Sequence, residues 1–154
     1  DDLVAALRAI RPILSDRGLI GLVEPLGFPV SSLRLKATAV RAIEAAGGAD
    51  VFRLMHDTFH HHLASETQVF ADWTGLVHIS GVTDPGVAVD DMLDAHRVLV
   101  DDGDRLDNLG QIRALRGAGY DGPFSFEPFA TSVHDAADPQ AALQASIDHI
   151  RSAL

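Results

Sequence analysis

The hydrophobic pattern of the chain alternates between two periods. Segments with an apolar side chain every three or four positions are typical of helices, and short continuous apolar runs are typical of buried strands. The first helical segment covers residues 2–17 and is followed by Gly18, a residue that commonly ends helices. Its apolar stripe consists of Leu3, Leu7, Ile10 and Leu14.

A second helical stripe lies in residues 31–48. Ser31 and Ser32 favour a helix start there, and a glycine pair ends the segment. Its stripe consists of Leu33, Ala37, Val40 and Ile43. Three more helices are predicted, over about Ala64–Trp73, over 108–119 after Asp107, and over Pro139–Leu154 with the proline in the first turn.

Short apolar runs separate these helices. They are LIGLVEPL (19–26), VFRLMHDTF (51–59), LVHIS (76–80) and GPFSFEP (122–128). Each consecutive pair of runs is joined by a connection long enough to hold a helix, as parallel strands require. The chain is therefore predicted to be one α/β domain over residues 1–154, with about four parallel strands and covering helices.

The number of predicted strands is half of that in a closed barrel. A closed (β/α)₈ TIM barrel has eight strands and typically more than about 200 residues, and this chain begins with a helix that no strand precedes. We therefore expect the C-terminal half of such a barrel. The alternative is a free-standing sheet whose two edges are covered by another chain, and an exposed edge of this kind favours a homo-oligomer.

Composition excludes several functions. The net charge of −10 argues against nucleic acid as a partner, which requires a concentrated basic surface. No apolar run approaches the roughly 20 residues of a membrane-spanning helix, so we expect a soluble cytoplasmic protein with no membrane partner. The chain has no cysteine, so a bound metal would be held by His, Asp or Glu.

Four metal-competent side chains fall at or near the C-terminal ends of the four predicted strands. They are Glu24, Asp57, His78 and Glu127. Any one of them alone would more often be a helix cap or a loop anchor. In parallel barrels, however, this end of the strands carries the active site. Three carboxylates and an imidazole suit Mn²⁺, Mg²⁺ or Co²⁺, with Zn²⁺ as an alternative.

Five motifs follow one another along the chain. VEPLGF, HDTFHH, LVHISG, DAHRVLVDDGD and GYDGPFSFEPF together resemble the xylose-isomerase-like TIM barrels, which include sugar phosphate isomerases and epimerases, inosose isomerases and tagatose 3-epimerases. The resemblance covers nearly the whole chain. It implies an inosose isomerase-like enzyme that moves a proton on a small sugar or cyclitol.

The resemblance also implies residue roles. One divalent ion, Mn²⁺ by first expectation, would be bound by Glu24, Asp57, His78 and Glu127. Of these, Glu24 and Glu127 would exchange the proton, and His60 and Arg97 would bind the substrate. The metal would hold the oxygens of an enediolate, which lowers the cost of removing a proton from carbon.

The remaining histidines of the HDTFHHH stretch, and His96 outside it, have other predicted positions. His56 precedes Asp57 on the predicted strand, so its side chain should point to the opposite face and pack against a helix. His61 and His62 lie past the strand end, either in loop or helix-start positions or along the pocket. His96 either contacts substrate or forms a hydrogen bond within its own loop.

Two other functions stay open. Endonuclease IV-like phosphodiesterases share the barrel, but they need further metal ligands and a basic surface for DNA. A half-barrel that binds or assembles without catalysis is the second alternative. Metal binding without proton exchange would favour it.

Overall fold

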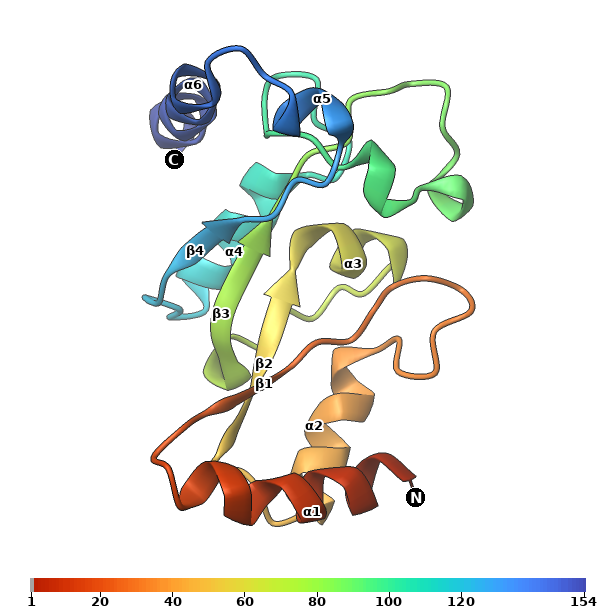
Figure 1. Ribbon diagram of the computed structural model, residues 1–154, viewed down its shortest axis with the longest axis vertical. Helices are drawn as coiled ribbons and strands as arrows, with labels where there is room; N and C mark the ends of the chain where they lie inside the picture. The colour runs from red at the N-terminus through yellow and green to blue at the C-terminus, as the bar shows by residue number, and fades with distance from the viewer. Residues whose placement is uncertain (1) are drawn as a thin grey trace.

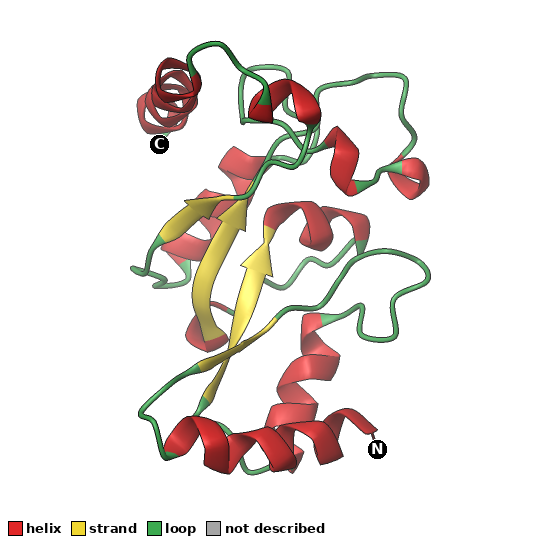
Figure 2. Cartoon of the chain, viewed as in Figure 1, coloured by secondary structure: helices red, strands yellow, loops and turns green. Residues whose placement is uncertain are grey.

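The computed structural model describes residues 2–154 and contains a four-stranded parallel sheet with the order β1-β2-β3-β4 (Figures 1 and 2). The strands are β1 Gly21–Val23, β2 Phe52–Asp57, β3 Thr74–Ile79 and β4 Phe124–Phe126. Each strand pairs in parallel with the next one along the chain. The predicted α/β class and the four parallel strands are confirmed.

Helices connect and flank these strands. The α-helices are α1 Asp2–Ser15, α2 Lys36–Ala45, α3 Thr58–Leu63, α4 Asn108–Gly117, α5 Thr131–His134 and α6 Pro139–Ala153. Three short 3₁₀ turns are η1 Ala71–Trp73, η2 Val89–Asp91 and η3 Asp94–His96. Within residues 2–154, every helix is too short or too polar to cross a lipid bilayer.

The helix predicted over 64–73 was misplaced. The helix of this connection is α3, which starts directly after β2 because the carboxylate of Asp57 accepts a hydrogen bond from the backbone N–H of His60. Ser65 and Phe70 have φ angles of 53° and 55°, and this left-handed backbone interrupts helix continuation. Only η1 occupies the end of the predicted range.

The predicted serine cap of α2 was also wrong. The helix begins at Lys36, and the preceding residue, Leu35, makes no side-chain cap. The hydroxyl of Ser31 instead donates to the carbonyl of Leu33. The carboxylate of Glu66 accepts from the backbone N–H of Lys36 at 3.0 Å, so a distant residue caps this helix.

The strands all point toward one end of the sheet, which has two open edges. The arrowheads of β2 and β3 point toward the end of the molecule that holds α3 and α5, while α1 crosses the opposite end (Figure 1). Because β1 and β4 are the outer strands, each has one unpaired side within the described sheet. Leu19 and Ile20, just before β1, are 52% and 53% exposed. The edge at β1 therefore presents apolar side chains.

Candidate metal centre

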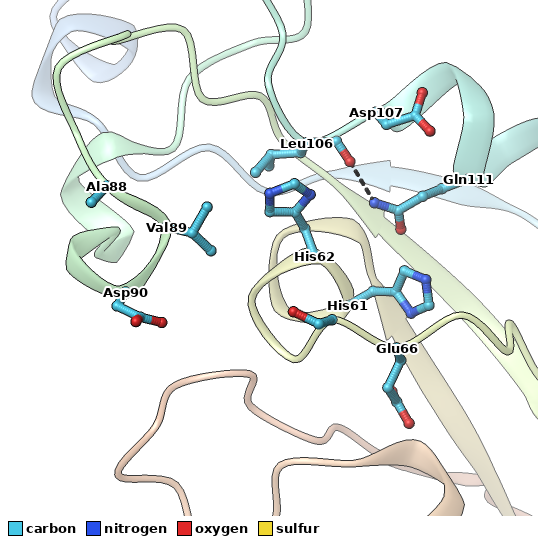
Figure 3. A pocket seen from close by; sticks show the side chains of 10 residues that line it. His61, His62, Glu66, Ala88, Val89, Asp90, Leu106, Asp107 and Gln111 are labelled. Atoms are coloured by element: carbon cyan, nitrogen blue, oxygen red, sulfur yellow. Dashed lines mark hydrogen bonds between the residues drawn. The ribbon is translucent and has the colours of Figure 1, made fainter.

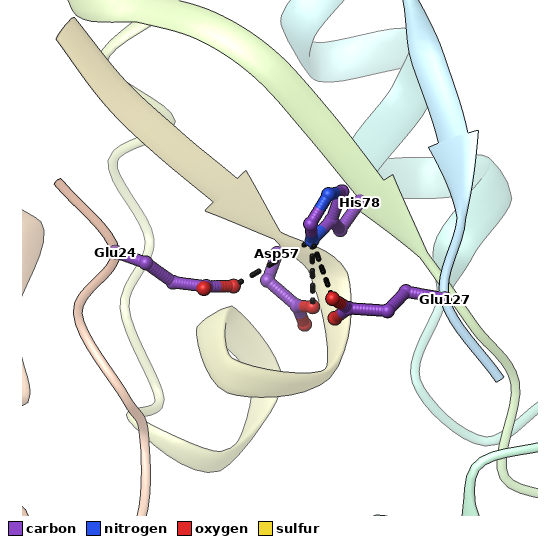
Figure 4. Close-up of side chains that lie close together, drawn as sticks. All are labelled: Glu24, Asp57, His78 and Glu127. Atoms are coloured by element: carbon purple, nitrogen blue, oxygen red, sulfur yellow. Dashed lines mark ion pairs between the residues drawn. The ribbon is translucent and has the colours of Figure 1, made fainter. Parts of the chain in front are cut away.

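The four strand-end residues meet at one point. Asp57, the last residue of β2, is the direct register partner of His78 on β3. Glu24 follows β1 and Glu127 follows β4, so each outer strand carries one carboxylate toward this central pair (Figure 4). Parallel strands with similar ends thus collect side chains that are separated by up to 103 residues in the sequence (24 to 127).

The distances are compatible with one shared cation. Nδ1 of His78 lies 3.1 Å from Glu127 Oε1, 3.7 Å from Glu24 Oε1 and 4.0 Å from Asp57 Oδ2. One ligand atom from each of the four residues lies within 4.8 Å of all the others. Oxygen and nitrogen ligands bind divalent ions at about 2.0–2.4 Å, so ligand atoms on opposite sides of one ion are up to about 4.8 Å apart.

Two of these ligand atoms have no hydrogen-bond partner among the described residues. They are Nδ1 of His78 and Oε1 of Glu24, and both are buried. The 3.1 Å approach of His78 to Glu127 does not have hydrogen-bond geometry. Buried polar atoms are nearly always satisfied, so unpaired atoms that converge on one point indicate a ligand. The donor set fits a divalent cation.

Arg97 balances part of the negative charge. Its Nη2 atom donates to Asp57 Oδ2 at 2.6 Å and to Glu127 Oε2 at 2.9 Å. Its Nε atom donates to the hydroxyl of the buried Ser80 at 2.9 Å, and the arginine is only 1% exposed. Sequence reasoning placed Arg97 near the site but missed Ser80, for which the sequence offers no signal.

His60 lies on the first turn of α3, next to this centre. It is buried, and its ring contacts Phe28 and Phe59 edge to face at centroid distances of 5.0 Å and 5.2 Å. Its Nδ1 atom has no partner among the described residues. Burial lowers the pKa of His60, so the ring is held neutral. A neutral imidazole with a free nitrogen can bind a hydroxyl or carbonyl group.

Glu24 and Glu127 lie in an environment that favours their protonated forms. Burial, and then the charges of Asp57 and Glu127, raises the pKa of Glu24 from 4.5 to about 7 in the metal-free chain. Burial also raises the pKa of Glu127. Burial is the main cause of both shifts, and repulsion from neighbouring carboxylates adds to it. A cation placed among them would relieve this repulsion.

The other histidines follow the predictions in part. His56 is fully buried and points away from the centre, where its Nε2 atom lies 3.0 Å from Oε1 of Gln111 on α4. The predicted packing of His56 against a helix is confirmed. Nδ1 of His96 accepts a hydrogen bond from the backbone N–H of Leu93, so this side chain bonds within its own loop.

His61 and His62 line a separate cavity of about 540 Å³ (Figure 3). None of the four converging residues lines this cavity, which lies between α3, the loop around Val89 and the start of α4. The candidate metal centre is therefore defined by the convergence of its four side chains and not by cavity volume.

Comparisons with known proteins agree with this geometry. The family described as xylose isomerase-like TIM barrel matches residues 1–153. A xylose isomerase domain containing protein from Salmonella typhimurium LT2 is 33% identical to this chain with a TM-score of 0.86, over 97% of this chain and 55% of its own. No curated protein gives a significant match.

Two more distant structures share the fold. The IolI protein, solved with a zinc atom, is 18% identical with a TM-score of 0.79, over 99% of this chain and 56% of its own. A D-psicose 3-epimerase from Clostridium cellulolyticum H10 is 19% identical with a TM-score of 0.70, over 98% and 55%. This chain spans about half the length of each of these proteins. It belongs to the xylose isomerase-like TIM barrel family and corresponds to about half of such a barrel.

Proposed function

We propose that the chain supplies the metal centre of a divalent-metal-dependent isomerase or epimerase that acts on a small keto-polyol or sugar. Inosose-type cyclitols are the nearest substrate class. The observation that carries the proposal is the convergence of Glu24, Asp57, His78 and Glu127 within 4.8 Å at the C-terminal ends of four parallel strands. The shared fold with a D-psicose 3-epimerase supports the same class of reaction.

Residues from the outer strands and residues from the inner strands have different tasks in this reaction. Glu24 and Glu127 come from the two outer strands, so they approach a central substrate from two sides and can remove and return a carbon-bound proton. Asp57 and His78, from the inner strands, hold the ion. A bound divalent ion, with Mn²⁺ as the first choice, supplies positive charge next to the substrate oxygens when the proton leaves.

Two more residues would orient the substrate. The unpaired Nδ1 atom of His60 is available for a substrate oxygen, and the rings of Phe28 and Phe59 fix its direction. Arg97 donates to both Asp57 and Glu127, and its guanidinium carbon lies 4.9 Å from the ring centroid of Phe59. We assign Arg97 a contact with substrate oxygens next to these carboxylates.

Metal binding is the first test. Calorimetric titration of Mn²⁺ into the metal-stripped chain should show binding of one ion. Asp57→Asn should weaken binding by at least about 100-fold, because it removes a ligand charge. Asp50→Asn is the matched control, because this exposed carboxylate forms an ion pair with Arg11 and is not one of the four converging residues. It should leave binding unchanged.

Proton exchange is the second test. The Mn²⁺-loaded chain is incubated with a keto-inositol or a ketohexose in D₂O, and deuterium at carbon is measured by mass spectrometry. Deuterium incorporation that is absent from Asp57→Asn supports the proposal. A chain that binds Mn²⁺ but exchanges no carbon-bound proton in any of these substrates would be a metal-binding module without catalysis. A chain that does not bind Mn²⁺ would refute the proposed site.

A further inference from the structure

A second group of buried polar side chains adjoins the residues of the candidate metal centre. Lys36, the only lysine of the chain, is 3% exposed, and its Nζ atom lies 2.5 Å from Nδ1 of His61. The ring of His61 packs against that of His56 at a centroid distance of 4.7 Å. The group continues from His56 to Gln111 at 3.0 Å. It therefore joins α2, α3, β2 and α4, and we call these four residues the Lys36 network.

Hydrogen-bond geometry determines the charge of this network. The amide nitrogen of Gln111 donates to the carbonyl of Leu106 (Figure 3) and to that of Thr58. Its oxygen is therefore left as an acceptor for His56. The ammonium of Lys36 has only hydrogens to offer, so Nδ1 of His61 must be an acceptor. Because its Nδ1 accepts, the ring of His61 is neutral, and Lys36 carries the positive charge of this contact.

One carboxylate compensates that charge. Oε2 of Glu66 lies 3.3 Å from Nζ of Lys36, and its other oxygen accepts from the backbone N–H of the same lysine. Both side chains are at least nine-tenths buried. Burial lowers the pKa of Lys36 from 10.5 to about 8, against the opposing effect of Glu66, so the ammonium is still charged at neutral pH. Burying a paired charge costs free energy, so a buried ion pair at this position raises the question of its role.

The network flanks the turn that carries the site residues. His56 directly precedes the ligand Asp57, and His61 directly follows His60. Along this turn the side chains of His56 and His61 point to the network, while Asp57 and His60 lie at the metal centre. Helix α3 has six residues, too few to be stable by itself. Its orientation must therefore come from contacts such as these.

We propose that Lys36 is a positioning residue of the metal centre. Its ammonium fixes α3 through His61 and Glu66, and so sets the directions of Asp57 and His60. This inference rests on the proposed function, because it assumes that Asp57 binds the ion. Residues that orient metal ligands by hydrogen bonding typically change metal affinity by about 10–100-fold when they are replaced.

The test uses Co²⁺ as a spectroscopic probe of ligand geometry. Metal-stripped wild type, Lys36→Met and Arg11→Met are titrated with Co²⁺, and the visible absorption band and the affinity are recorded. Lys36→Met should bind Co²⁺ at least about 10-fold more weakly and shift the band. Arg11→Met removes a cation from an exposed ion pair on α1 and should match wild type.

A pair of His61 variants keeps the test decisive if Lys36→Met does not fold. His61→Gln keeps an acceptor for the ammonium and should retain affinity and band, whereas His61→Leu removes it and should lose both. Folding is checked by circular dichroism. Folded Lys36→Met or His61→Leu with wild-type affinity and band would overturn the proposal. Wild type without Co²⁺ or Mn²⁺ binding would instead refute the proposed function, so the two failures are distinguishable.

Discussion

Arg97 shows how one residue sets the balance of charge at the site. Its buried guanidinium bonds both Asp57 and Glu127, so Arg97→Met leaves a fully buried aspartate without its cation. Loss of one partner of a buried ion pair costs about 3–5 kcal/mol. Urea unfolding of the metal-free chain should show a loss of this size. Added Mn²⁺ should restore part of it, because the ion supplies positive charge at the same carboxylates.

The control for this prediction is Arg11→Met. Arg11 makes a two-bond ion pair with Asp50, but both side chains are exposed to water. Exposed pairs are screened by solvent, and this change should alter stability little. Equal losses in the two variants would contradict the electrostatic account of Arg97.

The raised pKa of Glu24 predicts that the stability of the metal-free chain depends on pH. Its pKa is about 7 in the folded state and near 4.5 in the unfolded state, so the folded chain binds more protons between pH 4.5 and 7. Stability from this group is therefore lost as the pH rises through that window. After allowance for solvent screening, we expect wild type to lose about 3 °C more in Tm from pH 5 to pH 7 than Glu24→Gln does. Parallel Tm profiles for the two proteins would show that Glu24 does not titrate in this range.

Among the elements, α4 was placed correctly because its start has a strong local signal. Asp107 adopts a left-handed backbone with φ 57°, and its carboxylate accepts from the N–H of Gly110. Asp107→Ala loses the cap and places alanine in strained backbone, for a loss of about 2 kcal/mol. Asp107→Asn keeps both a cap and a tolerated conformation. Thermal unfolding should show a Tm for Asp107→Asn close to wild type and several degrees above that of Asp107→Ala.

The misplaced start of α2 depends on a distant residue. The stripe of α2 was visible, but its start is capped by Glu66, 30 positions away. Lys36 lies four and seven residues before Val40 and Ile43, so it occupies a stripe position normally held by an apolar residue. This mismatch at Lys36 and the predicted packing of His56 against a helix were the sequence signals of the Lys36 network. Its partners Glu66 and Gln111 could be known only from the fold.

On the scale of the whole molecule, the sequence predicted which strand ends carry polar groups, and parallel topology then required these ends to share one edge. The meeting of Glu24, Asp57, His78 and Glu127 follows from that rule. The detailed charge balance does not, because Arg97 reaches the centre from the long connection between β3 and α4. The direction of a side chain in such a loop depends on packing that local patterns do not encode.

The four-strand arrangement makes a last prediction about dynamics. Glu24 and Glu127 follow the outer strands β1 and β4, which have three residues each and lie at the open edges of the sheet. One ion that binds all four residues would tie both edges to the buried inner strands and suppress their local opening. Hydrogen exchange followed by mass spectrometry should show that peptides 19–26 and 124–130 exchange at least about 10-fold more slowly after Mn²⁺ addition than before it.

Helix α6 and the variant Asp57→Asn provide the controls for this experiment. Residues 139–153 lie outside the ion's ligands, so their exchange should change little. Asp57→Asn removes an inner ligand, so Mn²⁺ should no longer protect either edge. Protection of only one edge in wild type would mean that the ion contacts three strands and that the carboxylate of the unprotected edge is free. That carboxylate would then act as the proton-transferring base without serving as a ligand.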